Sequence, residues 1–176
     1  MAMVYKDGPS YYGFLANPRT GSRSIRQLLQ RLGWRRDGPH HARPSRPVKH
    51  SFCVVRHHAD ALVSWSHHLS RPLEDADDLV ELIAALSYNS YGGWWNLSGE
   101  LFPFASGTVG SPDVLRYERL EEEVGDWLEG HGFTRLQLPH VGRSDRKPWA
   151  EVFTVEMLEV LEDYYVDEME RLGYRI

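Results

Sequence analysis

The sequence predicts an α/β fold, a single domain in which helices flank a mainly parallel central sheet. Three features lead to this class: short apolar, β-rich runs alternate with segments of helical period, polar turns follow those runs, and no repeat or clear linker divides the 176 residues. Strands that alternate with helices are typical of parallel sheets, whose ligands bind at the carboxyl ends of the strands. We therefore expect the turns after the first three strands to meet at one edge of the sheet.

The first strand and the first helix are predicted on either side of the segment NPRTGSRS. An apolar run over residues 13–16 predicts the strand. Apolar positions spaced i, i+3, i+4 and i+7 from Ile25 to Leu32 predict a helix with one buried face, which ends near Gly33. A basic loop rich in Pro and Gly follows over residues 34–47.

The second strand is predicted over residues 50–56, because a continuous apolar run is the pattern of a strand buried on both faces of a parallel sheet. Helical period follows over residues 59–69 and again over residues 75–86. The segment 87–104 is rich in rings that could form an aromatic wall for a ligand, or equally a core or dimer contact. These rings belong to Tyr88, Tyr91, Trp94, Trp95, Phe102 and Phe104.

The last part of the chain completes the alternation of strands and helices. A third strand is predicted over residues 113–120, a helix over 121–132, a basic loop over 140–149 and a long helix over 154–174. The apolar side of that last helix carries Leu158, Leu161, Tyr165, Met169 and Leu172.

Charge is distributed unevenly along the chain, which has a net charge of -5. Residues 1–71 carry twelve Lys and Arg against three Asp and Glu, whereas residues 72–176 carry eight against twenty-two. A basic half in an acidic protein favours a small, highly charged anion over a nucleic acid, which the acidic half would repel. The acidic part is also consistent with solvated helix faces.

The chain carries no signal for export or for a membrane. Its beginning, MAMVYKDGPS, lacks a secretory apolar region, and its apolar runs are too short to span a bilayer, so we expect a cytoplasmic protein. The single cysteine, Cys53, lies inside the apolar run SFCVV and is expected to be a buried, inert thiol.

The turn between the first strand and the first helix has the composition of an anion site. The first N–H groups of a helix have no intrahelical partner, and the positive end of the helix dipole lies behind them. Glycine allows close approach of the backbone, hydroxyls donate hydrogen bonds and arginines supply charge. The residues concerned are Arg19, Thr20, Gly21, Ser22, Arg23 and Ser24. A capped helix start with solvated arginines is the alternative.

Two other chemistries are less well supported. The turn lacks the spacing of a nucleotide triphosphatase loop, G-x-x-x-x-G-K-[ST], which makes a small-molecule kinase a minor alternative. Three adjacent histidine pairs invite a metal site, but neighbouring residues point in different directions and no metal-ligand spacing supports them, so no metal is expected. These pairs are His40-His41, His57-His58 and His67-His68.

A second anion site is predicted at Arg56, which ends the apolar run FCVV. Ser64 follows eight residues later, about two turns into the next helix. If the intervening residues fold back, both side chains could hold one phosphate. A surface arginine at the end of a strand is the other reading.

These segments, taken in order, resemble the sulfotransferases that use 3'-phosphoadenosine 5'-phosphosulfate (PAPS), in particular the carbohydrate or heparan type and the cytosolic type. The likeness covers nearly the whole chain through FLANPRTGSRSI, HHARP, FCVVRHHADALVSWSHHL, VLRYERLEEEV and the segment from GRSDRKPW to the end. It implies the P-loop-like sulfotransferase fold. It also implies that Pro18 to Ser24 bind the 5'-phosphosulfate and that Arg56 and Ser64 bind the 3'-phosphate.

Further site residues follow from the same resemblance. Tyr117 in RYE corresponds to the tyrosine that lies against the adenine, and Arg146 and Lys147 belong to the basic segment that closes over the nucleotide. There are departures: the family often has Asp-Pro or Asn-Pro after the arginine and a further arginine five residues on, where this chain has two histidines and Ala61.

The resemblance also implies a chemistry. Arg19 would stabilise the leaving 5'-phosphate and a histidine would be the general base, because its ordinary pKa of about 6.5 suits neutral pH. His41 in HHARP occupies the family's position for the base, with His40 next and His67, His68 or Glu74 after them. The expected partners are PAPS and a hydroxyl acceptor, a sugar or another small alcohol or phenol, without a metal. A non-catalytic PAPS-binding module is the main alternative, and the oligomeric state is left open.

Overall fold

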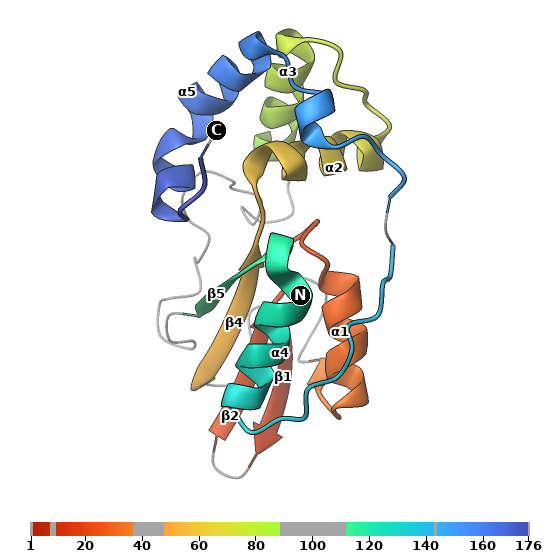
Figure 1. Cartoon of the computed structure of the whole chain (residues 1–176), viewed down its shortest axis with the longest axis vertical. Coiled ribbons are helices and arrows are strands. Elements are labelled where there is room, and N and C mark those ends of the chain that lie inside the picture. Colours follow the sequence, from red (N-terminus) through yellow and green to blue (C-terminus); the bar gives the residue numbers. More distant parts are fainter. Residues whose placement is uncertain (1, 8–9, 37–47, 89–111, 143, 176) are drawn as a thin grey trace. The chain divides into compact units, whose positions relative to one another are not determined.

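The computed structural model of the chain separates into two compact units (Figure 1). The sheet unit comprises Met1–Val55 and Phe102–Arg143, and the helical unit comprises Arg56–Leu101 and Ser144–Ile176. The expectation of a single domain stays a prediction, and each unit is described by itself. The structure describes residues 2–7, 10–36, 48–88, 112–142 and 144–175.

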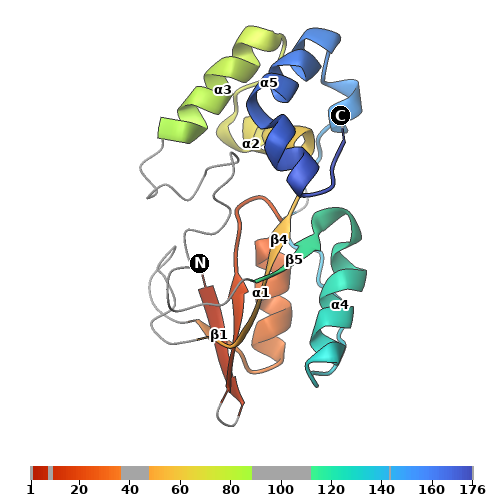
Figure 2. The same ribbon diagram turned by 90° about the vertical axis from the view of Figure 1, so that its left-hand side faces the viewer.

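The sheet unit contains a five-stranded sheet in the order β3-β1-β2-β4-β5 (Figures 1 and 2). Its three strands β2 (Ser10–Leu15), β4 (His50–Val55) and β5 (Asp113–Arg116) are parallel. The register sets Leu15 of β2 opposite Cys53 of β4, so the two strands end at the same edge. The predicted α/β class and the parallel strands flanked by helices are confirmed.

Two strands at the other side of the sheet are antiparallel, which the sequence analysis did not predict. β1 (Ala2–Asp7) pairs with β2 as a hairpin, and the two-residue β3 (Arg35–Arg36) pairs with β1. The sheet is therefore mixed: β2, β4 and β5 are parallel and carry the predicted turns, and β1 pairs antiparallel with both β2 and β3.

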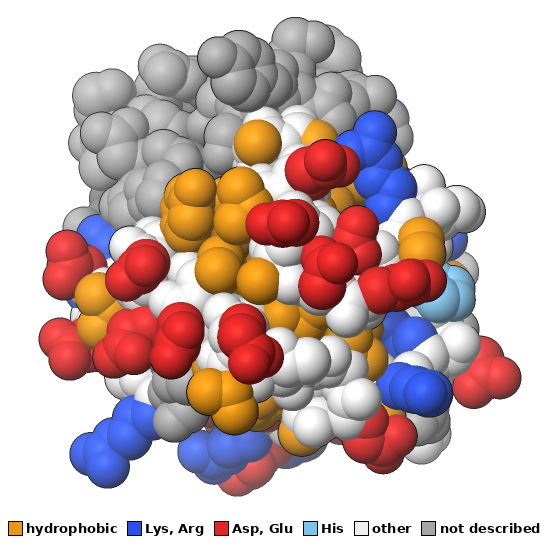
Figure 3. All heavy atoms as spheres, turned by 90° about the horizontal axis from the view of Figure 1, so that it is seen from above, with side chains coloured by type: hydrophobic (Ala, Val, Ile, Leu, Met, Phe, Trp, Pro, Cys, Tyr) orange, Lys and Arg blue, Asp and Glu red, His pale blue; other side chains and the backbone are white. Residues whose placement is uncertain are grey.

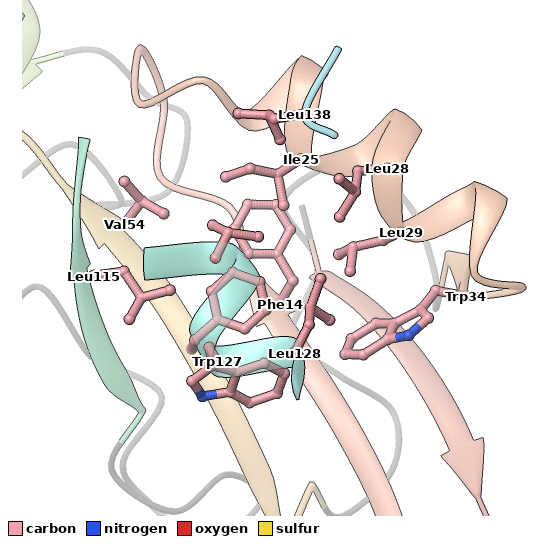
Figure 4. Close-up of a cluster of buried hydrophobic side chains, with 12 residues drawn as sticks. Phe14, Ile25, Leu28, Leu29, Trp34, Val54, Leu115, Trp127, Leu128 and Leu138 are labelled. Atoms are coloured by element: carbon pink, nitrogen blue, oxygen red, sulfur yellow. The ribbon is translucent and has the colours of Figure 1, made fainter. Parts of the chain in front are cut away.

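One hydrophobic core fills the space between the sheet and the helices α1 (Ser22–Arg31) and α4 (Leu120–Gly130) (Figure 4). α1 contains the predicted apolar period, begins three residues before it and ends just before Gly33, whose φ of 83° is the left-handed conformation that follows many helices. The buried side chains of the core are Phe14, Ile25, Leu28, Leu29, Trp34, Phe52, Val54, Leu115, Val124, Trp127, Leu128 and Leu138.

β4 is buried on both faces, as its continuous apolar run predicted. Phe52 and Val54 point into the core with α1 and α4, and Cys53 between them points to the opposite face. Burial, and then the nearby carboxylate of Asp113, raise the pKa of the Cys53 thiol to about 12. The prediction of a buried thiol is confirmed.

This thiol should react very slowly with iodoacetamide in the native protein, because only the thiolate is nucleophilic. Above the ordinary pKa of 9.0 the unfolded chain loses this proton while the native state keeps it until about pH 12. The contribution of Cys53 to stability is therefore complete below pH 9 and falls as the pH rises from 9 to 12. Rapid native alkylation at pH 8, compared with alkylation in urea, would contradict this.

The helical unit consists of α2 (His58–Leu69), α3 (Ala76–Tyr88) and α5 (Val155–Arg171), with a short 3-10 turn at Trp149–Glu151 (Figure 2). Thr154 caps α5, since its hydroxyl accepts a hydrogen bond from the N–H of Met157 at 3.3 Å. The predicted apolar side of α5 is largely correct: Leu161, Tyr165 and Met169 are buried. A second 3-10 turn, Tyr117–Arg119, joins β5 to α4 in the sheet unit.

The exposed side of α5 is strongly acidic. Figure 3 shows this face, where acidic side chains surround a few hydrophobic ones. Val155 and Tyr164 are 68% and 50% exposed. Among the residues that the structure describes, no helix is both long enough and apolar enough to cross a lipid bilayer.

Candidate functional site

The turn between β2 and α1 is held to the sheet by its own polar side chains. The side-chain amide of Asn17 donates to the carbonyl oxygen of Val54 in β4 at 2.9 Å, and the hydroxyl of Thr20 donates to the carbonyl oxygen of Asn17 at 2.7 Å. Arg19 and Gly21 both adopt positive φ, 59° and 73°. The turn is therefore a defined structure at the carboxyl edge of the parallel strands.

The start of α1 presents backbone N–H groups to this turn. Gly21 is the N-cap and has no side chain, and the first intrahelical hydrogen bond runs from the N–H of Ile25 to the carbonyl oxygen of Gly21 at 3.1 Å. In the described part of the chain no side chain caps this helix, and its first turn contains no acidic residue. The N–H groups of Ser22, Arg23 and Ser24 thus lie at the positive end of the helix dipole.

Position 21 favours glycine. A Cβ there would lie 2.7 Å from Cδ2 of Leu120 and 3.4 Å from Cε2 of Tyr117, in addition to the strain of its positive φ. A larger residue at position 21 would have to displace the end of the Leu120 side chain and adopt a strained backbone conformation. Tyr117, which the sequence analysis assigned to an adenine, packs here against Gly21 and the hydrophobic core.

The predicted hydroxyls of the turn differ in what they contact. Thr20 and Ser24 are both buried, and the oxygen of Ser24 accepts a hydrogen bond from the N–H of Val141 at 3.1 Å. These two hydroxyls hold the turn and the segment after α4 together. Pro18, Arg19 and Ser22 are half-buried, whereas Arg23 is exposed beside Gly142.

In the helical unit, the second predicted anion site contains an ion network. Nε and Nη2 of Arg56 lie 2.6 and 2.5 Å from Oδ2 of Asp60, and Nη2 of Arg146 lies 2.7 Å from Oδ1 of the same carboxylate. The side chains are 6%, 20% and 12% exposed in the order Arg56, Asp60 and Arg146. Two residues 90 positions apart, both predicted to bind the nucleotide, therefore share one carboxylate.

The other predicted residues of this unit lie on either side of the network. Ser64 is buried in α2, one helical turn beyond Asp60. Lys147 is exposed, and its carbonyl oxygen lies 3.4 Å from Nη1 of Arg146. The structure thus joins Arg146 to Arg56, while Lys147 points its charge to solvent.

The described histidines have separate surroundings. The ring of His57 stacks on Trp149 at 4.8 Å between centroids, with Nε2 3.0 Å from the carbonyl oxygen of Arg175. His58 is buried with Nε2 3.2 Å from Oε2 of Glu168. Among the described residues, no group of three or more His, Cys, Asp or Glu side chains could hold a metal ion.

Several of the predicted residues lie outside the described ranges. They are the candidate bases His40 and His41, and the aromatic residues of segment 87–104 apart from Tyr88, which ends α3. The next candidates are described: His67 and His68 are exposed in the last turn of α2, and Glu74 is exposed, with its N–H donating to the carboxylate of Asp78 at 2.8 Å.

Comparison with known proteins adds no family assignment. No family model, curated protein or solved structure matches this chain. The arrangement of the residues is therefore the basis for any functional proposal. The described residues contain two candidate anion sites, the uncapped start of α1 in the sheet unit and the pair Arg56 and Arg146 in the helical unit.

The sequence analysis missed Asp60. Its spacing from Arg56, i and i+4 across the start of a predicted helix, is the spacing at which oppositely charged side chains meet. This signal was available in the sequence.

Proposed function

We propose that the chain is a PAPS-dependent sulfotransferase, which transfers the sulfuryl group to a hydroxyl of a sugar or another small alcohol or phenol. Following the resemblance, we assign the 3'-phosphate of the donor to Arg56 and Ser64, together with Arg146, and the 5'-phosphosulfate to the residues from Pro18 to Ser24.

The observation that carries the proposal is the pairing of Arg56 with Arg146 on Asp60. The resemblance to sulfotransferases assigns these two arginines to the nucleotide from separate motifs, one after a central strand and one in the C-terminal basic loop. A shared carboxylate between them supports a common ligand. Two guanidinium groups with low exposure suit a phosphate dianion, because their charge-assisted hydrogen bonds are strong.

The turn before α1 supports the assignment of the phosphosulfate. An uncapped helix start with a glycine at positive φ offers several N–H donors to an anion without steric obstruction. Thr20 and Ser24 hold the turn, so Ser22 and the N–H groups are the better direct contacts. Arg19 supplies charge beside them.

The proposed reaction is an in-line displacement at sulfur. The acceptor oxygen forms a bond to sulfur while the bond between sulfur and the bridging phosphate oxygen breaks, and adenosine 3',5'-bisphosphate leaves. A base, His41 in this proposal, takes the hydroxyl proton. Arg19 and the N–H groups of α1 stabilise the negative charge that develops on the bridging oxygen, so the protein contributes mainly position and electrostatics.

Binding of nucleotides tests the proposal directly. We expect calorimetry to show tight binding of adenosine 3',5'-bisphosphate and weak binding of ATP, which lacks a 3'-phosphate. Arg56→Ala should weaken bisphosphate binding by about 1.5–3 kcal/mol, the usual loss of a charged hydrogen-bonding partner. Arg71→Ala is the matched control, because Arg71 is an exposed arginine of the same unit.

Two results would contradict the assignment. ATP binding as tight as the bisphosphate would favour a small-molecule kinase, and an unchanged affinity in Arg56→Ala would move the 3'-phosphate elsewhere. Transfer of labelled sulfate from PAPS to a panel of glycans, phenols and lipids then tests catalysis. Bisphosphate binding without transfer to any acceptor would favour the non-catalytic binding module.

A further inference from the structure

Asp60 is an unexpected residue at a site for an anion. A carboxylate beside two arginines lowers the local charge from +2 to +1 and repels a phosphate dianion. If the site needed only positive charge, an uncharged residue at position 60 would serve it better. The carboxylate must therefore favour binding in another way that outweighs this repulsion.

Each of the two carboxylate oxygens of Asp60 accepts hydrogen bonds from a different arginine. Oδ2 accepts from Arg56, four residues earlier, and Oδ1 accepts from Arg146, 86 residues later. Asp60 lies in the first turn of α2, where a negative charge is also favourable toward the helix dipole. Asp60 thus links Arg146, a residue of a loop, to helix α2.

Arginine side chains lose much rotamer freedom when they are held against a ligand, and this loss opposes binding. A carboxylate that already holds both guanidinium groups removes part of that loss before the ligand arrives.

We propose that Asp60 is a positioning residue that orders Arg146, and with it the segment 144–150, against Arg56 so that the two guanidinium groups bind one phosphate monoester. This inference rests on the proposed function for the identity of the ligand. The alternative is a competitor role, in which Asp60 occupies the position of the phosphate and has to move away before the phosphate can bind.

The two roles predict opposite changes in bisphosphate affinity for Asp60→Asn. This substitution keeps the volume of the side chain and removes its charge. If Asp60 positions the arginines, bisphosphate binding should weaken by about tenfold although a repulsive charge has been removed. If Asp60 is a competitor, binding should tighten. Asp163→Asn is the matched control, because it removes one exposed carboxylate from the same unit.

A second measurement needs no nucleotide. Hydrogen exchange of the amides of residues 144–150 in the ligand-free protein should be faster in Asp60→Asn than in the wild type and in Asp163→Asn. Arg146→Met should give the same increase, and adding Asp60→Asn to Arg146→Met should not raise the exchange of this segment further. Asp60→Glu, which keeps the charge, should recover part of the bisphosphate affinity and part of the protection of residues 144–150 from hydrogen exchange.

The outcomes separate the inference from the proposed function. Tighter bisphosphate binding in Asp60→Asn, or unchanged affinity and exchange, would overturn the positioning role. If the wild type binds the bisphosphate no better than adenosine 5'-phosphate, the proposed function fails, and the exchange data alone still decide whether Asp60 orders Arg146. Should Asp60→Asn not fold, as judged by circular dichroism, the comparison of Arg146→Met with the wild type decides: unchanged exchange contradicts the proposal.

Discussion

His41→Ala is expected to slow sulfuryl transfer by about 100-fold or more, the range for the loss of a general base, while bisphosphate affinity stays nearly unchanged. In the proposed reaction the base acts on the acceptor hydroxyl and does not hold the nucleotide, so binding and chemistry should separate. Single-turnover transfer from labelled PAPS and calorimetry with the bisphosphate measure the two properties on the same protein.

His40→Ala is the control for this prediction, because adjacent residues seldom point in the same direction. The wild-type rate should fall on the acid side with an apparent pKa near histidine's ordinary value of about 6.5, and this limb should disappear in His41→Ala. Full activity in both single variants would reject the pair as the base. Attention would then move to His67, His68 and Glu74.

Phe14→Ala should lower the free energy of unfolding by about 3–5 kcal/mol. The Phe14 side chain has no exposure and stacks on Phe52 at 5.0 Å between centroids, at the centre of the core between β2, α1 and α4. Its removal leaves a cavity that the surrounding strands and helices cannot close. Urea unfolding followed by circular dichroism measures the loss.

Tyr164→Ala provides a comparison on the exposed face of α5, where half of the side chain is already in contact with water. Its effect should stay within about 0.5 kcal/mol, as for most surface substitutions. A loss below about 1 kcal/mol in Phe14→Ala would show that the contacts around Phe14 contribute less than its burial indicates.

The sequence predicted the parallel part of the fold because local patterns determine it. β4 follows from a continuous apolar run, and α1 follows from its apolar period and the glycine at its end. β1 was missed because its sequence, AMVYKD, has a short, mixed apolar and polar pattern, and its pairing with β2 comes from a hairpin. β3 is two residues long and exposed, which leaves no pattern to detect.

The candidate site was predictable in its residue types but not in its connections. Arg56 and Arg146 were both selected as ligands of the nucleotide, yet no spacing rule links positions 90 apart, so their meeting on Asp60 required the fold. For the same reason the burial of Thr20 and Ser24 within the turn was not foreseen. His40, His41 and the aromatic segment stay predictions from sequence alone.

The interleaving of the two units along the chain has a consequence for synthesis. The first 55 residues of the sheet unit leave the ribosome before Leu115, Val124, Trp127 and Leu128, which complete their core. At about 5–20 residues per second, roughly 4–18 s pass between residue 55 and residue 143. During that interval the apolar face of β2 and β4 lacks its α4 partners, and the helical unit is completed only by residues 144–176. The N-terminal part of the sheet unit is therefore exposed to chaperones while the following residues are made.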